Sequence, residues 1–278
     1  MRPEDLTLTT SQQATGKRIR VKHGPTQRQN RRFIVGATIL VIVSLWYVKL
    51  DFSMFVANID KTYGIIGRLL NPNWTMALPY FTSFIDTLAI AFVALLTALL
   101  FALPIAYLTA SNTAPFPKLA RVLLTLFSLI RAVPITIWGL VGAASIGFGS
   151  QAGVLGLFLP TISYLARILA QRIEEAGYDI IEAMSASGTP WIVMVFRGLT
   201  QELMPQLIAT VALRFELTTS ETISLGMVGI AGIGYTLNMS IGTYNFENAS
   251  MGILIIFMGM WITEYTTRRM VSWIRKER

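Results

Sequence analysis

The chain contains no cysteine and a single histidine, and only 14% of its 278 residues are charged. Without cysteine it can form no disulfide, no zinc–thiolate site and no cysteine nucleophile. The phosphate-loop pattern GxxxxGK[ST] and the hydrolase patterns HExxH and GxSxG are also absent. The histidine, His23, lies in a basic segment and is expected to be neither ligand nor catalyst. We therefore expect no catalytic residue, no metal site and no cofactor in this chain.

The scarcity of charge accompanies an apolar content of 53%. Because a soluble domain usually has about 25% charged residues, this composition indicates a membrane protein. A membrane span needs about 20 mostly apolar residues. Six segments qualify, at about 33–50, 80–108, 117–146, 152–172, 203–234 and 249–270. The sequence thus predicts an all-α membrane protein with about six transmembrane helices, the first of them an uncleaved span.

Basic residues gather at both ends of the chain. Residues 1–32 contain eight Lys or Arg and two acidic residues, and residues 268–278 contain five and one. Basic flanks of apolar spans mark the cytoplasmic side, so both termini are expected in the cytoplasm of a multi-pass cell-membrane protein. We expect these charges to meet lipid headgroups and no nucleic acid.

Four regions follow from these patterns. Their expected bounds are a basic cytoplasmic tail at 1–32, a first span with an outer interfacial helix at 33–79, a membrane core at 80–272 with a cytoplasmic loop at 174–205, and a basic C-terminal tail at 273–278. The outer helix is predicted because apolar residues recur there at three- and four-residue steps, from Phe52 to Leu70.

The 174–205 loop is expected to form a helix, a glycine stop and a second helix. An apolar face of the first helix consists of Ile180, Ile181 and Met184. Gly188 supplies the left-handed stop, and Thr189 should cap the second helix with Pro190 at its first position. An exposed amphipathic helix suits docking into a partner's groove. A re-entrant or packing loop is the alternative.

The stretch LRFELTTSETISLG places three charged residues inside an apolar run. Each charge at mid-bilayer costs at least about 2.5–3.5 kcal/mol, so Arg214, Glu216 and Glu221 should avoid lipid. Arg214 and Glu221 share a helix face but are about 10 Å apart in rise, so we expect no direct contact. With Thr219 and Ser220, they are expected to line a water-filled path or gate. Structural pairing with other spans is the alternative.

Two segments are expected to bend or break helices. Arg131 precedes Val133-Pro134 in the third span, where proline kinks a helix. Arg131 is therefore a gate candidate, with snorkelling to the interface as the alternative. The run GMVGIAGIG contains no GxGxxG pattern. Its glycines are expected to allow close helix packing or a broken span, at Gly226, Gly229, Gly232 and Gly234.

Several motifs occur in a familiar order. Glu182-Ala183-Met184, followed by Gly188, resembles the EAA loop of bacterial ABC-importer permeases. RAVP at 131–134, AGVLGL at 152–157, LRFE at 213–216, LGMVGIAGIG at 225–234 and TEYTTRRM at 263–270 extend the likeness. Together they resemble the phosphonate/phosphite-type permeases over residues 80–272.

The resemblance implies a type I ABC-importer permease fold and half of a translocation path for a small oxyanion, opened by alternating access. It implies two cytoplasmic ATPase subunits, which would hold ATP and Mg²⁺, an extracytoplasmic substrate-binding protein and a second permease. The residues expected to couple the chain to the ATPase are Ile181, Glu182, Ala183, Met184 and Gly188.

One departure from the family concerns the second permease. The family tends to carry an arginine just after its RFE-like motif, whereas this chain has Ser220 and Glu221. Self-pairing would place acidic groups on both sides of an anion path, so we expect a non-identical permease as partner. Alternative functions are an ion-gradient-driven transporter or channel that uses Glu216 and Glu221, an ABC importer for another solute such as an amino acid, and a membrane scaffold.

Overall fold

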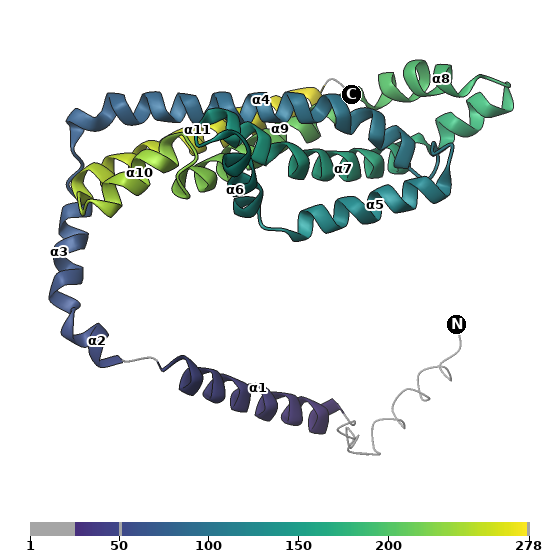
Figure 1. Ribbon diagram of the computed structural model, residues 1–278. Coiled ribbons are helices and arrows are strands. Elements are labelled where there is room, and N and C mark those ends of the chain that lie inside the picture. The colour runs from purple at the N-terminus through teal and green to yellow at the C-terminus, as the bar shows by residue number, and fades with distance from the viewer. Residues whose placement is uncertain (1–25, 50–51, 277–278) are drawn as a thin grey trace, which may run out of the picture. The chain divides into compact units, whose positions relative to one another are not determined.

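The computed structural model describes residues 26–49 and 52–276 (Figure 1). Its elements are α1 Thr26–Val48, α2 Phe52–Ala57, α3 Ile59–Leu69, a 3₁₀ turn Trp74–Met76, α4 Ala77–Thr109, α5 Pro117–Ala132, α6 Ile135–Ile146, α7 Ser150–Ala186, α8 Trp191–Val193, a π-helical segment Met194–Leu199, α9 Thr200–Met227, α10 Ile233–Gly242 and α11 Phe246–Lys276. No strand occurs in these ranges, which confirms the all-α prediction. Most of the predicted tail at 1–32, with His23, and the last two residues of the 273–278 tail lie outside the described residues.

The chain divides into two compact units, and the boundary in the sequence follows Asp60. In the first unit, α1 carries the predicted first span, and its described side chains, from Asn30 onward, are all exposed. The predicted outer helix is present as two shorter helices, α2 and α3. The boundary falls inside α3, so the second unit contains most of α3 together with α4 to α11.

Within the described residues, four helices are long and apolar enough to cross a membrane: α1, α4, α7 and α11. A fifth span results if α5 and α6 are counted together as one span bent by 88°. The prediction of about six spans also included α9, whose charged residues place it outside this apolar class. Its 28 residues nevertheless give a length of about 42 Å, enough to span a bilayer. The cytoplasmic placement of both termini stays a prediction.

The core of the second unit is the contact between α4 and α7, which run side by side (Figure 1). A row of fully buried alanines on α4 faces this contact: Ala91, Ala94, Ala98, Ala102 and Ala106. On α7, Leu165, Leu169 and Ile173 are equally buried. Small residues let membrane helices approach closely, which supplies packing where burial from water does not drive association.

Pro134 has a larger effect than the predicted kink. α5 ends at Ala132 and α6 begins at Ile135, and the two helix axes differ in direction by 88°. The indole Nε1–H of Trp138 donates to the carbonyl of Ile130 at 3.1 Å across the break. The Val133 N–H donates to the same carbonyl at 3.4 Å, so the indole adds a second bond that stabilises the turn beside Arg131.

The predicted fifth span breaks before its expected end. α9 stops at Met227, and Gly229 and Gly232 adopt left-handed backbone conformations, with φ of +94° and +80°, that glycine tolerates best. α10 then packs against α9. A Cβ atom on Gly234 would lie 2.0 Å from the Ile223 carbonyl oxygen, and one on Gly226 would lie 2.8 Å from the Gly234 Cα. The chain therefore breaks at Gly229 and Gly232, and α9 and α10 approach each other closely at Gly226 and Gly234.

A side chain from α4 caps the first turn of α10. The buried N–H of Ile233 donates to Thr87 Oγ1 at 2.9 Å. We expect Thr87→Val to lower the free energy of unfolding by about 1–3 kcal/mol, because the buried N–H loses its acceptor. Thr97→Val is the matched control, since Thr97 is exposed and bonds only to its own helix. Equal losses in a denaturant titration of the two variants would contradict this capping role.

The end of α3 is fastened to the start of α11. Arg68 donates to Glu247 through Nε at 2.7 Å and Nη2 at 2.8 Å, and also to the Tyr244 carbonyl at 3.0 Å. The hydroxyl of Ser250 donates to the Leu69 carbonyl. The hydrogen bond to Glu247 raises the pKa of Arg68 above its ordinary value. These contacts fix the segment between α3 and α4 to the membrane core.

Candidate functional site

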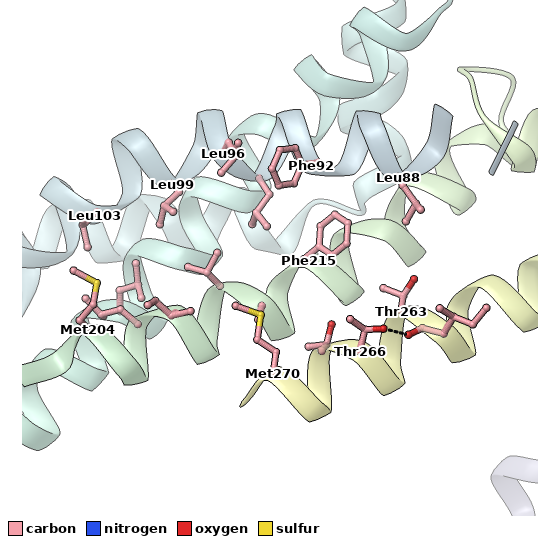
Figure 2. A pocket seen from close by; sticks show the side chains of 18 of the residues that line it. Leu88, Phe92, Leu96, Leu99, Leu103, Met204, Phe215, Thr263, Thr266 and Met270 are labelled. Atoms are coloured by element: carbon pink, nitrogen blue, oxygen red, sulfur yellow. Dashed lines mark hydrogen bonds between the residues drawn. The ribbon is translucent and has the colours of Figure 1, made fainter. Parts of the chain in front are cut away.

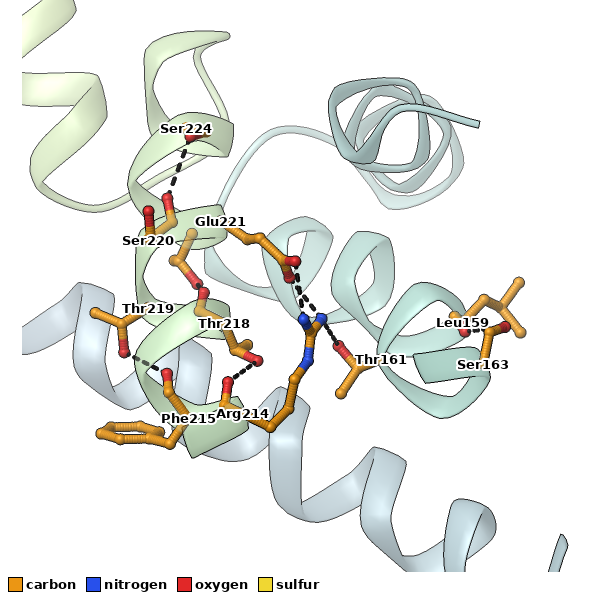
Figure 3. Close-up of polar contacts among 11 residues, drawn as sticks. Leu159, Thr161, Ser163, Arg214, Phe215, Thr218, Thr219, Ser220, Glu221 and Ser224 are labelled. Atoms are coloured by element: carbon orange, nitrogen blue, oxygen red, sulfur yellow. Dashed lines mark hydrogen bonds and ion pairs between the residues drawn. The ribbon is translucent and has the colours of Figure 1, made fainter. Parts of the chain in front are cut away.

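Arg214 lies in the middle of α9, with about 20 Å of helix on either side. Only 4% of its side chain is exposed, and it donates to Glu221 through Nη1 at 3.0 Å and Nη2 at 2.7 Å (Figure 3). The prediction that these residues cannot meet is wrong. That prediction considered only the distance between the two residues along the helix axis. The side chains of Arg214 and Glu221 are long, and they extend toward each other along the shared helix face, so their charged groups meet.

The other groups around Arg214 come from α7. Nη2 also donates to Thr161 Oγ1 at 3.3 Å, and the guanidinium carbon lies 4.4 Å from the ring centre of Tyr164. The Arg131 guanidinium carbon lies 5.4 Å from the same ring centre. Thr161 and Tyr164 had no place in the sequence analysis. Two arginines at membrane depth are a sequence signal for a shared aromatic neighbour, because cations are attracted to ring faces.

Two features leave this arrangement incompletely satisfied. The buried Nε–H of Arg214 has no acceptor among the described residues. Arg131 is exposed, and within residues 52–276 it makes no ion pair. The group formed by Arg131, Tyr164, Arg214 and Glu221, here called the arginine site, therefore has two cations and one carboxylate. It carries spare donor capacity for an anion.

The remaining predicted path residues do not join the arginine site. Thr219 is fully buried and its hydroxyl donates to the Phe215 carbonyl of its own helix at 2.9 Å. Ser220 is exposed. Glu216 is half-buried, and among the described residues no hydrogen bond or ion pair reaches it. Thr218 and Thr222 likewise donate to carbonyls of α9 itself, so most hydroxyls of this stretch are satisfied locally.

Two cavities differ in chemistry. One of about 520 Å³ lies among α4, α9 and α11 and is lined mainly by leucine, phenylalanine and methionine (Figure 2). It offers few polar groups, so it does not suit an oxyanion. Another of about 420 Å³ lies between α5 and α7 and is lined by Arg121, Ser128, Arg167, Gln171 and Glu174, among others. Arg167 donates to Ser128 at 2.9 Å across it.

The 174–205 loop begins as a continuation of α7, which runs unbroken to Ala186. Gly188 has a φ of +71°, as predicted for the stop, and the Thr189 N–H reaches back to the Met184 carbonyl at 3.2 Å. The capping prediction is wrong. Thr189 lies close to Ser187, with 2.9 Å between their hydroxyl oxygens, and α8 begins at Trp191, after Pro190, without a side-chain cap.

The predicted apolar docking face of this loop is turned inward. Ile180, Ile181 and Met184 are half-buried, because the chain folds back on them. A Cβ atom on Gly198 would lie 2.3 Å from the Met184 sulfur, and Ile181 packs with the cluster that contains Leu199. The exposed residues at the tip of the loop and beyond it include Glu182, Ala183, Ser185, Ala186, Ser187, Gly188, Pro190, Ile192, Phe196 and Arg197, with Trp191 partly covered.

No metal centre accompanies these features in the described part of the chain. There, no three His, Cys, Asp or Glu side chains gather where they could hold a metal ion. The arginine site is an arrangement of hydrogen-bond donors and charges, which suits binding of an anion.

Comparison with known proteins gives three informative matches. A family model described as "binding-protein-dependent transport system inner membrane component" matches residues 102–274, which contain the arginine site and the 174–205 loop. The phosphate-import permease protein PhnE of Mycolicibacterium smegmatis is 30% identical over 243 residues, 87% of this chain. The phosphite transport system permease protein PtxC of Stutzerimonas stutzeri is 28% identical over 218 residues, 78% of this chain and 79% of that protein.

Two further facts bound these likenesses. The chain spans 44% of the length of the M. smegmatis relative. Among solved structures, the MetNI methionine ABC transporter in an inward-facing conformation contains a chain that superposes with a TM-score of 0.65 at 20% identity, covering 73% of this chain and 99% of the other. This superposition confirms the expected fold of a type I importer permease.

Proposed function

The chain belongs to the family of binding-protein-dependent transport system inner membrane components, and from this premise we propose that it forms half of the translocation path of an ATP-driven importer for a small oxyanion. The relatives named for phosphate and phosphite transport support this solute class, which includes phosphonates. The observation that carries the proposal is the pair formed by Arg214 and Glu221. A bidentate guanidinium in the middle of a membrane helix matches the geometry of phosphate-like oxygens.

Three charged residues and one hydroxyl are proposed to border the path: Arg131, Glu216, Glu221 and Ser220. Arg131 and Ser220 are exposed on the isolated chain, and Glu221 and Glu216 are partly so. A charged group that faces lipid at membrane depth is costly, so these residues are expected to face water or another protein chain. Alternating access would open the space before them to each side in turn.

A second permease is proposed to cover part of the exposed surface. Asp86, which the sequence analysis passed over, is exposed on α4 nine residues after the helix begins, about 14 Å along its axis. A carboxylate there is expected to face water or a partner surface that offers a donor or a cation. We expect a non-identical permease. Arg214 neutralises Glu221 within this chain. The carboxylates that remain to disfavour self-pairing are therefore those of Glu216 and Asp86.

The exposed tip of the 174–205 loop is proposed to dock on a cytoplasmic ATPase subunit. Glu182, Ala183 and Gly188 remain on the exposed side, whereas Ile181 and Met184 would act indirectly, by holding the tip against the π-helical segment. ATP and Mg²⁺ would be bound, and ATP hydrolysed, by that separate subunit. An extracytoplasmic binding protein is proposed to deliver the solute.

Native mass spectrometry of the complex that co-purifies with the tagged chain tests the assembly. The expected mass contains this chain, a different permease and two ATPase subunits. Two copies of this chain with two ATPases would retain the importer and reject the unequal pair. A chain that retains no ATPase under gentle extraction would reject the importer.

A charge substitution tests the docking site. Ala183→Arg should reduce co-purification of the ATPase and ATP-driven uptake by at least about tenfold, because a long cation would be buried at the interface without a partner. Ser272→Arg, at an exposed position of α11 outside the loop, is the control and should have little effect. Equal ATPase recovery with the two variants would show that the loop tip is not the docking site.

A further inference from the structure

We propose that the arginine site binds the oxyanion directly and that Glu221 is a tethered anion that occupies the Arg214 guanidinium until the oxyanion displaces it. The site's ligand class is a tetrahedral phosphorus oxyanion such as phosphate, phosphite or a phosphonate. This inference rests on the proposed function and deepens it, because it names which groups hold the solute inside the membrane.

The geometry of the pair makes displacement feasible. Glu221 accepts both Nη hydrogen bonds of Arg214, and two oxygens of a phosphorus oxyanion can occupy the same positions. The Glu221 side chain is 28% exposed whereas that of Arg214 is 4% exposed. The carboxylate is therefore the accessible member of the pair. It can move toward open space while the guanidinium stays fixed between α9 and α7.

Arg214 and its neighbours offer more hydrogen-bond donors than the two carboxylate oxygens of Glu221 can accept from. The buried Nε–H lacks an acceptor among the described residues, and Thr161 offers a hydroxyl at 3.3 Å from Nη2. An anion with three or four oxygens can keep two of them on the Nη atoms and accept from the Thr161 hydroxyl with another, whereas a carboxylate has two oxygens and both are engaged with the Nη atoms.

Arg131 supplies the second positive charge. Both arginines lie against Tyr164, so their guanidinium carbons are no more than about 10 Å apart, given 4.4 Å and 5.4 Å to one ring centre. A tetrahedral anion directs oxygens to several sides, so one anion between the two arginines can bind both after a modest side-chain movement. With Glu221 displaced, two cations face the anion, which favours a dianion over chloride.

The position of the site excludes lipid phosphate as the ligand. Arg214 lies about 20 Å along α9 from either helix end, whereas lipid headgroups lie at the membrane faces. The phosphate source is therefore the transported solute.

Equilibrium binding of ³²P-labelled inorganic phosphate to the intact purified complex, in nanodiscs and without binding protein, tests the proposal. Glu221→Gln should tighten phosphate binding by about tenfold, because the competing carboxylate charge is gone. Arg214→Lys and Arg131→Gln should each weaken it by about tenfold or more, since a lysine cannot replace the two-point contact. Sulfate should compete and chloride should not.

Glu264→Gln is the matched control. It removes the carboxylate of another Glu–Arg pair within one helix, with Arg268 on α11, and should leave phosphate affinity unchanged. A Glu221→Gln complex that assembles normally and binds phosphate no more tightly than the unsubstituted complex would overturn the tethered-anion proposal.

The outcome also separates this inference from the proposed function. If the ATPase co-purifies but Glu221→Gln, Arg214→Lys and Arg131→Gln all leave phosphate affinity unchanged, the importer proposal is retained and the arginine site is only structural. If phosphate binds as expected and no ATPase co-purifies, the site stands and the importer fails.

Discussion

Replacing Arg214 by methionine should strongly reduce oxyanion uptake and lower the free energy of unfolding by about 3 kcal/mol, at the lower end of the range for a broken buried ion pair. The lower end applies because the Glu221 side chain, left without its cation, is 28% exposed and can gain water. Uptake should fall by at least about 30-fold, the effect of truncating one partner of a buried charge contact.

A second substitution separates the two effects. Arg214→Met combined with Glu221→Leu removes the unpaired carboxylate, and apolar replacement of a buried pair is often neutral or stabilising. We expect the double variant to regain stability in a denaturant titration but to remain inactive in ATP-driven uptake by proteoliposomes. Recovery of uptake together with stability would mean that the pair only holds α9 in shape and never contacts the solute.

The second large effect is expected at the crossing of α9 and α10. Gly234→Ala would place a methyl group 2.0 Å from the Ile223 carbonyl oxygen and 2.9 Å from the Met227 nitrogen. Both neighbours are backbone atoms, which cannot rotate away, so the helices must separate. We expect a loss of at least about 3 kcal/mol in the free energy of unfolding, the upper part of the range for overpacking. The yield of folded, monodisperse protein after extraction should fall accordingly.

Gly242→Ala is the control on the same helix. No atom lies within 4 Å of its added methyl group, so the substitution should be neutral or stabilise α10 by up to about 1 kcal/mol through helix propensity. If the two alanine variants unfold at the same denaturant concentration, α10 does not pack on α9 as closely as the glycine contacts require.

Hydropathy and local backbone chemistry determined much of the fold directly from the sequence. An apolar content of 53% and segments of about 20 apolar residues require a membrane protein, because helix is the structure that satisfies its own backbone in lipid. The breaks at Pro134 and at Gly229 and Gly232 were also readable, since ring constraints and positive φ are properties of single residues. The order of the short motifs along the sequence also indicated the permease family to which the comparison with known proteins then assigned the chain.

Only the tertiary structure decided which side chains meet. Arg214 joins Glu221, Thr161 and Tyr164 because α7 and α9 cross at those positions, and a pattern along one helix carries no information about its neighbour. The loop face of Ile180, Ile181 and Met184 turned inward for the same reason. Periodicity identifies an apolar face, but whether that face meets a partner or the protein's own π-helical segment depends on how the chain folds back.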